Sequence, residues 1–251
     1  MTGFWTLFKR ESLRFLTLPN QTLLPSAINV FLYVIVFGHI IGSQVKEVQG
    51  FSFIEFVFPG LVMMGTTTSA FQNTATTLFI ARWEQFIDDL LVAPVTYFQM
   101  VCAFTLSAVL RGVLVGLICF CVGFLFGEFT LVHPFLFLVS VVSASFCFAG
   151  IGLINGLFAK RWDHIAVFQN YIITPFVFLG GVFYSMQMLP ESMQWMSFLN
   201  PLFYMVSIIR YACIGYADIP FYKGLMVTLT LGSFFFLIAL ELFRRGVNLR
   251  T

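Results

Sequence analysis

The sequence predicts an all-α integral membrane protein, and three observations lead to that class. First, 59% of the 251 residues are hydrophobic and only 10% are charged, whereas soluble domains carry roughly a quarter charged residues. Second, 34 residues are phenylalanine, a usage that suits lipid-facing helices and would favour aggregation of a soluble fold. Third, the charges gather in short stretches between apolar runs that are long enough to cross a bilayer.

The chain begins with an amphipathic stretch, Gly3 to Leu18, in which aromatic and basic residues are interspersed and which Pro19 ends. This composition predicts an interfacial helix on the cytoplasmic membrane surface. The next run, 22–41, carries no Lys, Arg, Asp or Glu. At about 1.5 Å per residue it is long enough to cross a hydrocarbon core of about 30 Å, so it is predicted to be span one.

Five further spans are predicted from the remaining apolar runs. They are expected at about 54–77, 97–126, 134–158, 165–184 and 221–243. Thr96 and Gln99 have the spacing of a capping box and predict where the helix of span three begins. Span four contains Gly150, Gly152 and Gly156, which favour close helix packing. Pro175 and Gly180-Gly181 are expected to bend span five.

The region between spans five and six, 190–214, is too apolar for a loop and too broken for two spans of about twenty residues each. Pro190 begins one short helix. Asn200 as N-cap and Pro201 as first helical residue begin another, for which Gly215 is the C-cap. We therefore predict a re-entrant helical hairpin, whose broken backbone must be covered by protein or face a water-filled cavity.

The stretch 78–94 is a charged amphipathic segment in an otherwise apolar sequence. Its apolar residues at helical spacing are Trp83, Phe86, Ile87, Leu90 and Leu91. The opposite face carries Arg82, Gln85 and Asp89, with Glu84 and Asp88 beside them. This periodicity predicts one surface helix that a membrane protein could offer to a soluble partner.

Lys and Arg near the span ends predict the orientation. With six spans and both termini in the cytoplasm, nine Lys and Arg residues fall inside and three outside. Those inside are Lys9, Arg10, Arg14, Arg82, Lys160, Arg161, Arg244, Arg245 and Arg250, and those outside are Lys46, Arg210 and Lys223. This asymmetry follows the positive-inside rule and places 78–94 in the cytoplasm.

A polar stripe runs along the second half of span two. Its residues Thr66, Ser69, Asn73 and Thr77 recur at helical spacing, with Gln72 and Thr76 adjacent. Such a stripe faces protein or water rather than lipid. Two interpretations stay open: hydrogen bonding between helices, including those of a dimer interface, or the lining of a solute path.

Arg111 lies inside span three. An arginine at the centre of a bilayer costs at least about 2.5 to 3.5 kcal/mol on insertion scales, so it must find water, a carboxylate or carbonyl oxygens. Arg111 is expected either to form a structural pair, for which Glu55 is a candidate, or to contact a polar or anionic solute.

The sequence contains no Walker A motif, no H-E-x-x-H and no G-x-S-x-G, and its cysteines and histidines have no metal-site spacing. No catalytic residue, metal site or cofactor of its own is therefore expected. Ion-coupled carriers usually place acids or histidines at the membrane midplane, whereas Glu55 and Glu241 lie near span ends. Energy from a cytoplasmic partner fits better, and a secondary transporter or channel is the alternative.

The sequence resembles the permease subunits of ABC-2 type exporters across nearly its whole length. The matching motifs are E-F-V-F-P-G-L at 55–61, the segment 82–94 with its D-D-L-L-V-A-P ending, G-V-F-Y at 181–184, M-L-P at 188–190, Trp195, L-N-P-L at 199–202, Tyr204, Arg210 and Gly215. Arg111 lies outside these motifs, so the resemblance assigns it no role.

The resemblance implies a bacterial inner membrane exporter that works as a homodimer, each copy bound to a cytoplasmic ATP-binding cassette ATPase that holds ATP and Mg. It implies a solute path between the two copies, and substrates that include drugs, lipid-linked or polymeric sugars and other amphipaths; nucleic acid is not expected to bind. The stretch 78–94 corresponds to the coupling helix, with Arg82, Trp83, Glu84, Phe86, Asp88, Asp89, Leu90 and Pro94 as coupling residues. The hairpin 190–214 corresponds to the extracellular gate, with Pro190, Asn200, Pro201, Tyr204 and Arg210.

Overall fold

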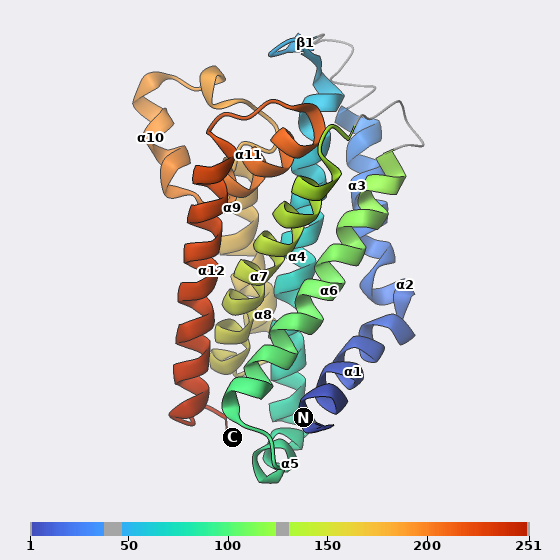
Figure 1. Cartoon of the computed structure of the whole chain (residues 1–251), viewed down its shortest axis with the longest axis vertical. Coiled ribbons are helices and arrows are strands. Elements are labelled where there is room, and N and C mark those ends of the chain that lie inside the picture. The colour runs from blue at the N-terminus through green and yellow to red at the C-terminus, as the bar shows by residue number, and fades with distance from the viewer. Residues whose placement is uncertain (1, 38–46, 124–130, 250–251) are drawn as a thin grey trace.

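The computed structural model describes residues 2–37, 47–123 and 131–249 of the chain. Its long helices run side by side along one axis, and its described strands, β1 (Glu47–Val48) and β2 (Phe51–Ser52), form a small antiparallel hairpin at one end (Figure 1). α5 lies at the opposite end, near the start of α1 and the end of α12. This architecture agrees with the predicted all-α membrane class.

Four of the described helices are long and apolar enough to cross a membrane. They are α4 (Phe53–Trp83), α6 (Tyr97–Gly123), α7 (Pro134–Phe158) and α12 (Phe221–Arg244). They correspond to the predicted spans two, three, four and six. The predicted end of span three, at 126, lies outside the described residues.

The N-terminal region is divided into three helices. α1 (Thr2–Thr17) covers the stretch predicted as an interfacial helix, whose position at the membrane surface stays a prediction, and α2 (Pro19–Thr22) follows directly. α3 (Leu24–Ile35) is shorter than the predicted span one, 22–41, whose last residues lie outside the described part.

The helix of predicted span five consists of three consecutive pieces. α8 (Trp162–Phe168) leads into a π-helical turn, Gln169–Ile173, and then into α9 (Thr174–Leu179). The turn precedes Pro175, whose missing N–H and bulky ring disturb the regular α-helical hydrogen bonding. The predicted end at 184 is wrong. The helix stops at Leu179 because Gly181 takes a left-handed conformation with φ +73°.

Two short helices occupy the region predicted as a hairpin, α10 (Glu191–Leu199) and α11 (Pro201–Ile214), after a 3-10 turn at Met186–Met188. The Asn200 side chain accepts a hydrogen bond from the Leu202 amide at 3.0 Å, and Gly215 ends α11 with φ +76°. These caps confirm the predicted helix boundaries. Both helices lie at the end of the bundle away from α5 (Figure 1), and their depth in a membrane stays a prediction.

The single helix predicted over 78–94 is wrong. α4 continues through Trp83, and a separate helix, α5 (Phe86–Val92), follows. The chain turns between them because Gln85 adopts a left-handed conformation with φ 58°, which a continuous helix does not contain.

α4 is the central helix of the bundle and packs closely against α6 and α7. A Cβ atom added at Gly152 of α7 would lie 2.1 Å from Thr74 Oγ1 and 2.5 Å from the Phe71 carbonyl oxygen, both in α4. One added at Gly156 would lie 2.8 Å from the Ala75 carbonyl oxygen. The glycines of α7 therefore allow two long helices to approach closely, as the sequence indicated.

Candidate functional site

The segment that joins α4 to α6 exposes an acidic and aromatic surface at one end of the bundle. Trp83 is 72% exposed, and Glu84, Asp88 and Asp89 are also exposed. Ile87 and Leu90 are buried, so α5 is amphipathic as predicted although it is only seven residues long. We call the exposed set of Trp83, Glu84, Asp88, Asp89 and Val92 the α5 surface.

α1 holds α5 in place from the side. The Arg10 guanidinium lies 3.5 Å from the centre of the Phe86 ring, and Leu7 belongs to the same apolar cluster as Ile87 and Leu90. At the start of α1, a Cβ atom added at Gly3 would lie 2.7 Å from Val95 Cγ2. The start of α1 is therefore in direct contact with α5 and with the segment that follows it.

Arg82 does not lie on the exposed polar face on which the periodicity placed it. Its side chain is buried, and Nη1 donates hydrogen bonds to the carbonyl oxygens of Gly156 (2.9 Å), Leu157 (2.7 Å) and Ala159 (3.1 Å). These carbonyls belong to the C-terminal end of α7, where a positive charge also interacts favourably with the helix dipole. Arg82 thus joins the end of α4 to the end of α7.

The capping box at the start of α6 is confirmed. The Thr96 amide donates to Gln99 Oε1 at 3.1 Å, and the Gln99 amide donates to Thr96 Oγ1 at 3.3 Å. Pro94, which precedes the box, is exposed. Two hydrogen bonds therefore define the start of α6, shortly after the α5 surface.

Asn73 and Thr77 of the polar stripe and Arg111 of α6 belong to one hydrogen-bonded network, which connects α1, α4 and α6. Arg14 donates to Thr77 Oγ1, Thr77 donates to the Asn73 carbonyl oxygen, and Asn73 Nδ2 donates to Ser107 Oγ at 3.3 Å. Arg111 Nη1 reaches Asn73 Oδ1 at 3.5 Å.

Thr66 and Ser69, the other two residues of the stripe, are buried, and Thr66 faces Gly116 of α6. Neither hydroxyl has a hydrogen-bond partner among the described residues. Asn73 and Thr77 therefore make the hydrogen bonds to other helices, and the lining of a solute path by the stripe stays a prediction.

Arg111 does not pair with Glu55. The Glu55 carboxylate accepts from the Ser52 amide at 3.0 Å in a capping box at the start of α4. Arg111 Nη2 instead donates to the Thr22 carbonyl oxygen at 3.0 Å, and within the described part of the chain no carboxylate forms an ion pair with it.

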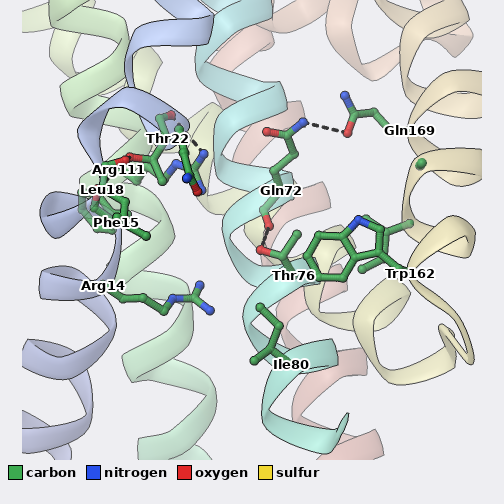
Figure 2. Close-up of a pocket in the computed structure, with 13 residues that line it drawn as sticks. Arg14, Phe15, Leu18, Thr22, Gln72, Thr76, Ile80, Arg111, Trp162 and Gln169 are labelled. Carbon is green, nitrogen blue, oxygen red and sulfur yellow. Dashed lines mark hydrogen bonds between the residues drawn. The ribbon is translucent and has the colours of Figure 1, made fainter. Parts of the chain in front are cut away.

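A cavity of about 400 Å³ opens beside this network. Figure 2 shows Arg14, Arg111 and Thr22 on one side, Trp162 and Gln169 on the other, and Gln72, Thr76 and Ile80 of α4 between them. Gln72 Nε2 donates to Gln169 Oε1 at 2.9 Å. Arg14, Trp162 and Gln169 were not predicted as site residues, because they lie far from the stripe along the chain and share no periodic pattern with it.

One carboxyl group beside the cavity is buried. Glu11 is 3% exposed and lies 3.5 Å from Arg14 and 3.8 Å from Arg10. Burial raises the pKa of Glu11 above its usual value of 4.5, and the charges of Arg14 and Arg10 only partly offset this effect. Glu11 is thus the carboxyl group that lies next to both arginines.

A buried ion pair stabilises the opposite end of the bundle. Arg210 Nη1 lies 2.8 Å from Asp218 Oδ2, and Arg210 also donates to the carbonyl oxygens of Gly181 (2.6 Å) and Phe56 (3.2 Å). Its guanidinium stacks on the Phe56 ring at 3.8 Å. Arg210 was predicted as a gate residue, whereas Asp218 was not, because it lies in a short loop without a recognisable motif.

The remaining predicted gate residues lie at the starts of the two short helices and in the first turn of α11. Pro190 precedes α10, Asn200 and Pro201 begin α11, and the Tyr204 hydroxyl donates to the Phe198 carbonyl oxygen at 2.9 Å. They fix the geometry of the turn between α10 and α11.

A scan against family models matches residues 2–214 to the ABC-2 type transporter family. The matched region includes α1, the α5 surface, the arginine-lined cavity and both short helices. The chain belongs to the ABC-2 type transporter family. It is therefore a transport permease, and the cavity and the α5 surface are features of a transport protein.

Curated relatives agree with this assignment. The permease is 37% identical over 253 residues to the "Inner membrane transport permease YadH" of Escherichia coli K12, with 99% of this chain and 98% of the relative covered. It is also 27% identical to "Nodulation protein J" of Bradyrhizobium diazoefficiens, with 96% and 93% covered. The first similarity and the apolar helices support a bacterial inner membrane protein.

Proposed function

We propose that this permease is the membrane-spanning subunit of an ATP-driven exporter. It works as a homodimer in which each copy binds a cytoplasmic ATP-binding cassette ATPase, and ATP and Mg are bound by that partner. The observation that carries this proposal is the α5 surface, an exposed acidic and aromatic patch on a helix held by Ile87, Leu90 and Phe86. Such a patch suits a basic or polar cleft on a soluble partner.

The proposed mechanism transmits force from the α5 surface to the bundle. Closure of the two ATPases on ATP moves the two copies of the α5 segment together. Arg82 carries this motion to α7, the capping box at Thr96 carries it to α6, and the contact of Arg10 with Phe86 carries it to α1. Rigid helices then change the path between the two copies, as in other domain-closure transitions.

The membrane arrangement in this proposal has six spans and both termini in the cytoplasm. The positive charges of the N-terminal helix, the α5 end and the C-terminus support it, since they lie on the proposed inner side. The hairpin of α10 and α11 then lies at the outer mouth, where the Arg210–Asp218 pair stabilises it. The solute is an amphipathic, hydrophobic or sugar-bearing molecule.

The test uses proteoliposomes that contain the permease and the ATP-binding cassette subunit that co-purifies with it. The double variant Asp88→Lys/Asp89→Lys is expected to lower permease-dependent ATPase activity by at least about tenfold, because close charge pairs at interfaces contribute strongly to binding. Membrane insertion should be unchanged, since both side chains are exposed. Glu191→Lys, an exposed acid on α10 at the other end, is the matched control and should keep full activity.

Two results would contradict the proposal. One is unchanged ATPase stimulation by the double variant. The other is solute movement in vesicles that follows an ion gradient without any ATPase, which would favour a secondary transporter or channel.

A further inference from the structure

The cavity beside Arg111 combines buried positive charge with apolar walls. We propose that it binds the acidic headgroup of an anionic amphipath, such as a phosphate monoester with an alkyl tail. The proposal rests on the proposed function only for the onward transport of the bound molecule. Binding itself requires the permease alone.

Arg111 is the first reason for an anionic ligand. It is 6% exposed, and its Nε atom has no hydrogen-bond partner among the described residues. Its two hydrogen bonds, to the Thr22 carbonyl oxygen and to Asn73 Oδ1, use only part of a guanidinium that has five donors. Both acceptors are neutral, so the charge of Arg111 is not compensated by a carboxylate of the described chain. A buried cation in this state is stabilised by an anion.

Arg14 adds a second positive charge to the cavity wall. Its acidic partner, Glu11, lies 3.5 Å away and is shared with Arg10 at 3.8 Å. One carboxylate therefore serves two arginines, and Arg111 remains without any. The cavity region carries an excess of positive charge that a phosphate or carboxylate group would neutralise.

The rest of the lining predicts that the ligand has an apolar part. Phe15, Leu18, Ile80, Trp162 and Ile165 line the same cavity, next to the amides of Gln72 and Gln169 (Figure 2). A volume of about 400 Å³ lies in the range of small-molecule sites, which are mostly apolar with a few polar groups that orient the ligand. A free inorganic anion would leave this apolar surface uncovered.

The proposal is tested with the full-length permease in phosphatidylcholine nanodiscs without ATP or ATPase. Saturable binding of radiolabelled octyl phosphate is measured by scintillation proximity, and the signal of empty nanodiscs is subtracted. Unlabelled octyl phosphate is expected to displace the probe at least about tenfold better than octanol or inorganic phosphate, because charged hydrogen bonds and the apolar tail both contribute. Equal competition by octanol would overturn the proposal without the use of any variant.

Variants then test Arg111 directly. Arg111→Gln should weaken octyl phosphate binding at least about tenfold, whereas Arg111→Lys should keep most of the affinity because the charge remains. Arg245→Gln removes an exposed arginine at the end of α12 and should have no effect. Unchanged affinity in Arg111→Gln would overturn the assignment.

A last arm identifies the source of the headgroup. Replacement of one-third of the phosphatidylcholine by phosphatidylglycerol should weaken octyl phosphate binding if bilayer lipid fills the cavity, and should leave it unchanged if the ligand is a separate amphipath. Because no ATPase is present, loss of binding overturns this inference alone. Failure of ATPase stimulation in proteoliposomes overturns the proposed function alone.

Discussion

Arg82 shows how one side chain can connect the α5 surface to a distant helix. It donates to three carbonyl oxygens at the end of α7. A buried carbonyl that loses its donor costs about 1 to 3 kcal/mol. Arg82 is therefore both a structural residue and, in the proposed mechanism, the link between α4 and α7.

Arg82→Gln should lower the free energy of unfolding by about 1 to 3 kcal/mol, since the shorter neutral side chain does not satisfy three carbonyls. The effect would appear as a lower melting temperature of the purified permease. Arg161→Gln, which changes an exposed arginine near the same helix end, is the control and should leave the melting temperature unchanged. Equal melting temperatures for the Arg82 variant and the native chain would contradict the proposed role.

At the residue scale the sequence identified important side chains but not their partners. Arg111 was singled out because a charge inside a span is costly, Arg82 because of the helical periodicity of 78–94, and Arg210 because of the family resemblance. Their acceptors were not predictable, because Gly156 lies 74 residues from Arg82 and Phe56 lies 154 residues from Arg210. Backbone carbonyls also have no sequence signature, and this explains why Glu55 was a plausible but wrong partner for Arg111.

At the scale of elements, α4 and α7 can pack closely because glycines, which have no side chain, lie at their contact. Gly152 lies against Thr74 and the Phe71 carbonyl, so any added atom meets backbone that cannot move easily. Gly65, in α4 itself, has its nearest neighbour at 3.3 Å, the Sγ atom of Cys119, which can rotate away. The two glycines therefore differ in what an added methyl group would do.

Gly152→Ala should destabilise the permease by about 1 to 3 kcal/mol, as expected for overpacking of a tight interface. Gly65→Ala should be neutral or stabilising, because alanine is favoured over glycine in helices by about 0.5 to 1 kcal/mol. Thermal unfolding of both variants checks the pair. The same melting temperature for both variants would show that the contact between α4 and α7 is not tight.

Element boundaries were predictable wherever local chemistry marks them. Pro134 at the start of α7, the Thr96 capping box and the Asn200 cap are such signals, and these helices begin where expected. The break at Gln85 was missed because a Trp-Glu-Gln sequence has no turn signal and the apolar spacing continues through it. Gln85 adopts a left-handed conformation that its local propensity does not favour. Ile87 and Leu90, which follow it, are buried against α1.

On the scale of the whole molecule, the bundle has two different ends. The α5 surface, the start of α1 and the end of α12 lie at one end, and α10, α11 and the Arg210–Asp218 pair lie at the other (Figure 1). The cavity of Arg14 and Arg111 lies between them, beside α4. In the proposed mechanism, an event at the α5 end changes access to this cavity.

The most direct test of the central claim is a distance measurement between the two copies of α5. Val92 is 86% exposed, so a nitroxide can be introduced there through a noncanonical amino acid while the native cysteines stay intact. Pulsed electron paramagnetic resonance on the complex with its ATPase should give one distance between copies, and trapping with ATP should shorten it. Absence of a dipolar signal between copies, or the same distance with and without ATP, would contradict the proposed mechanism.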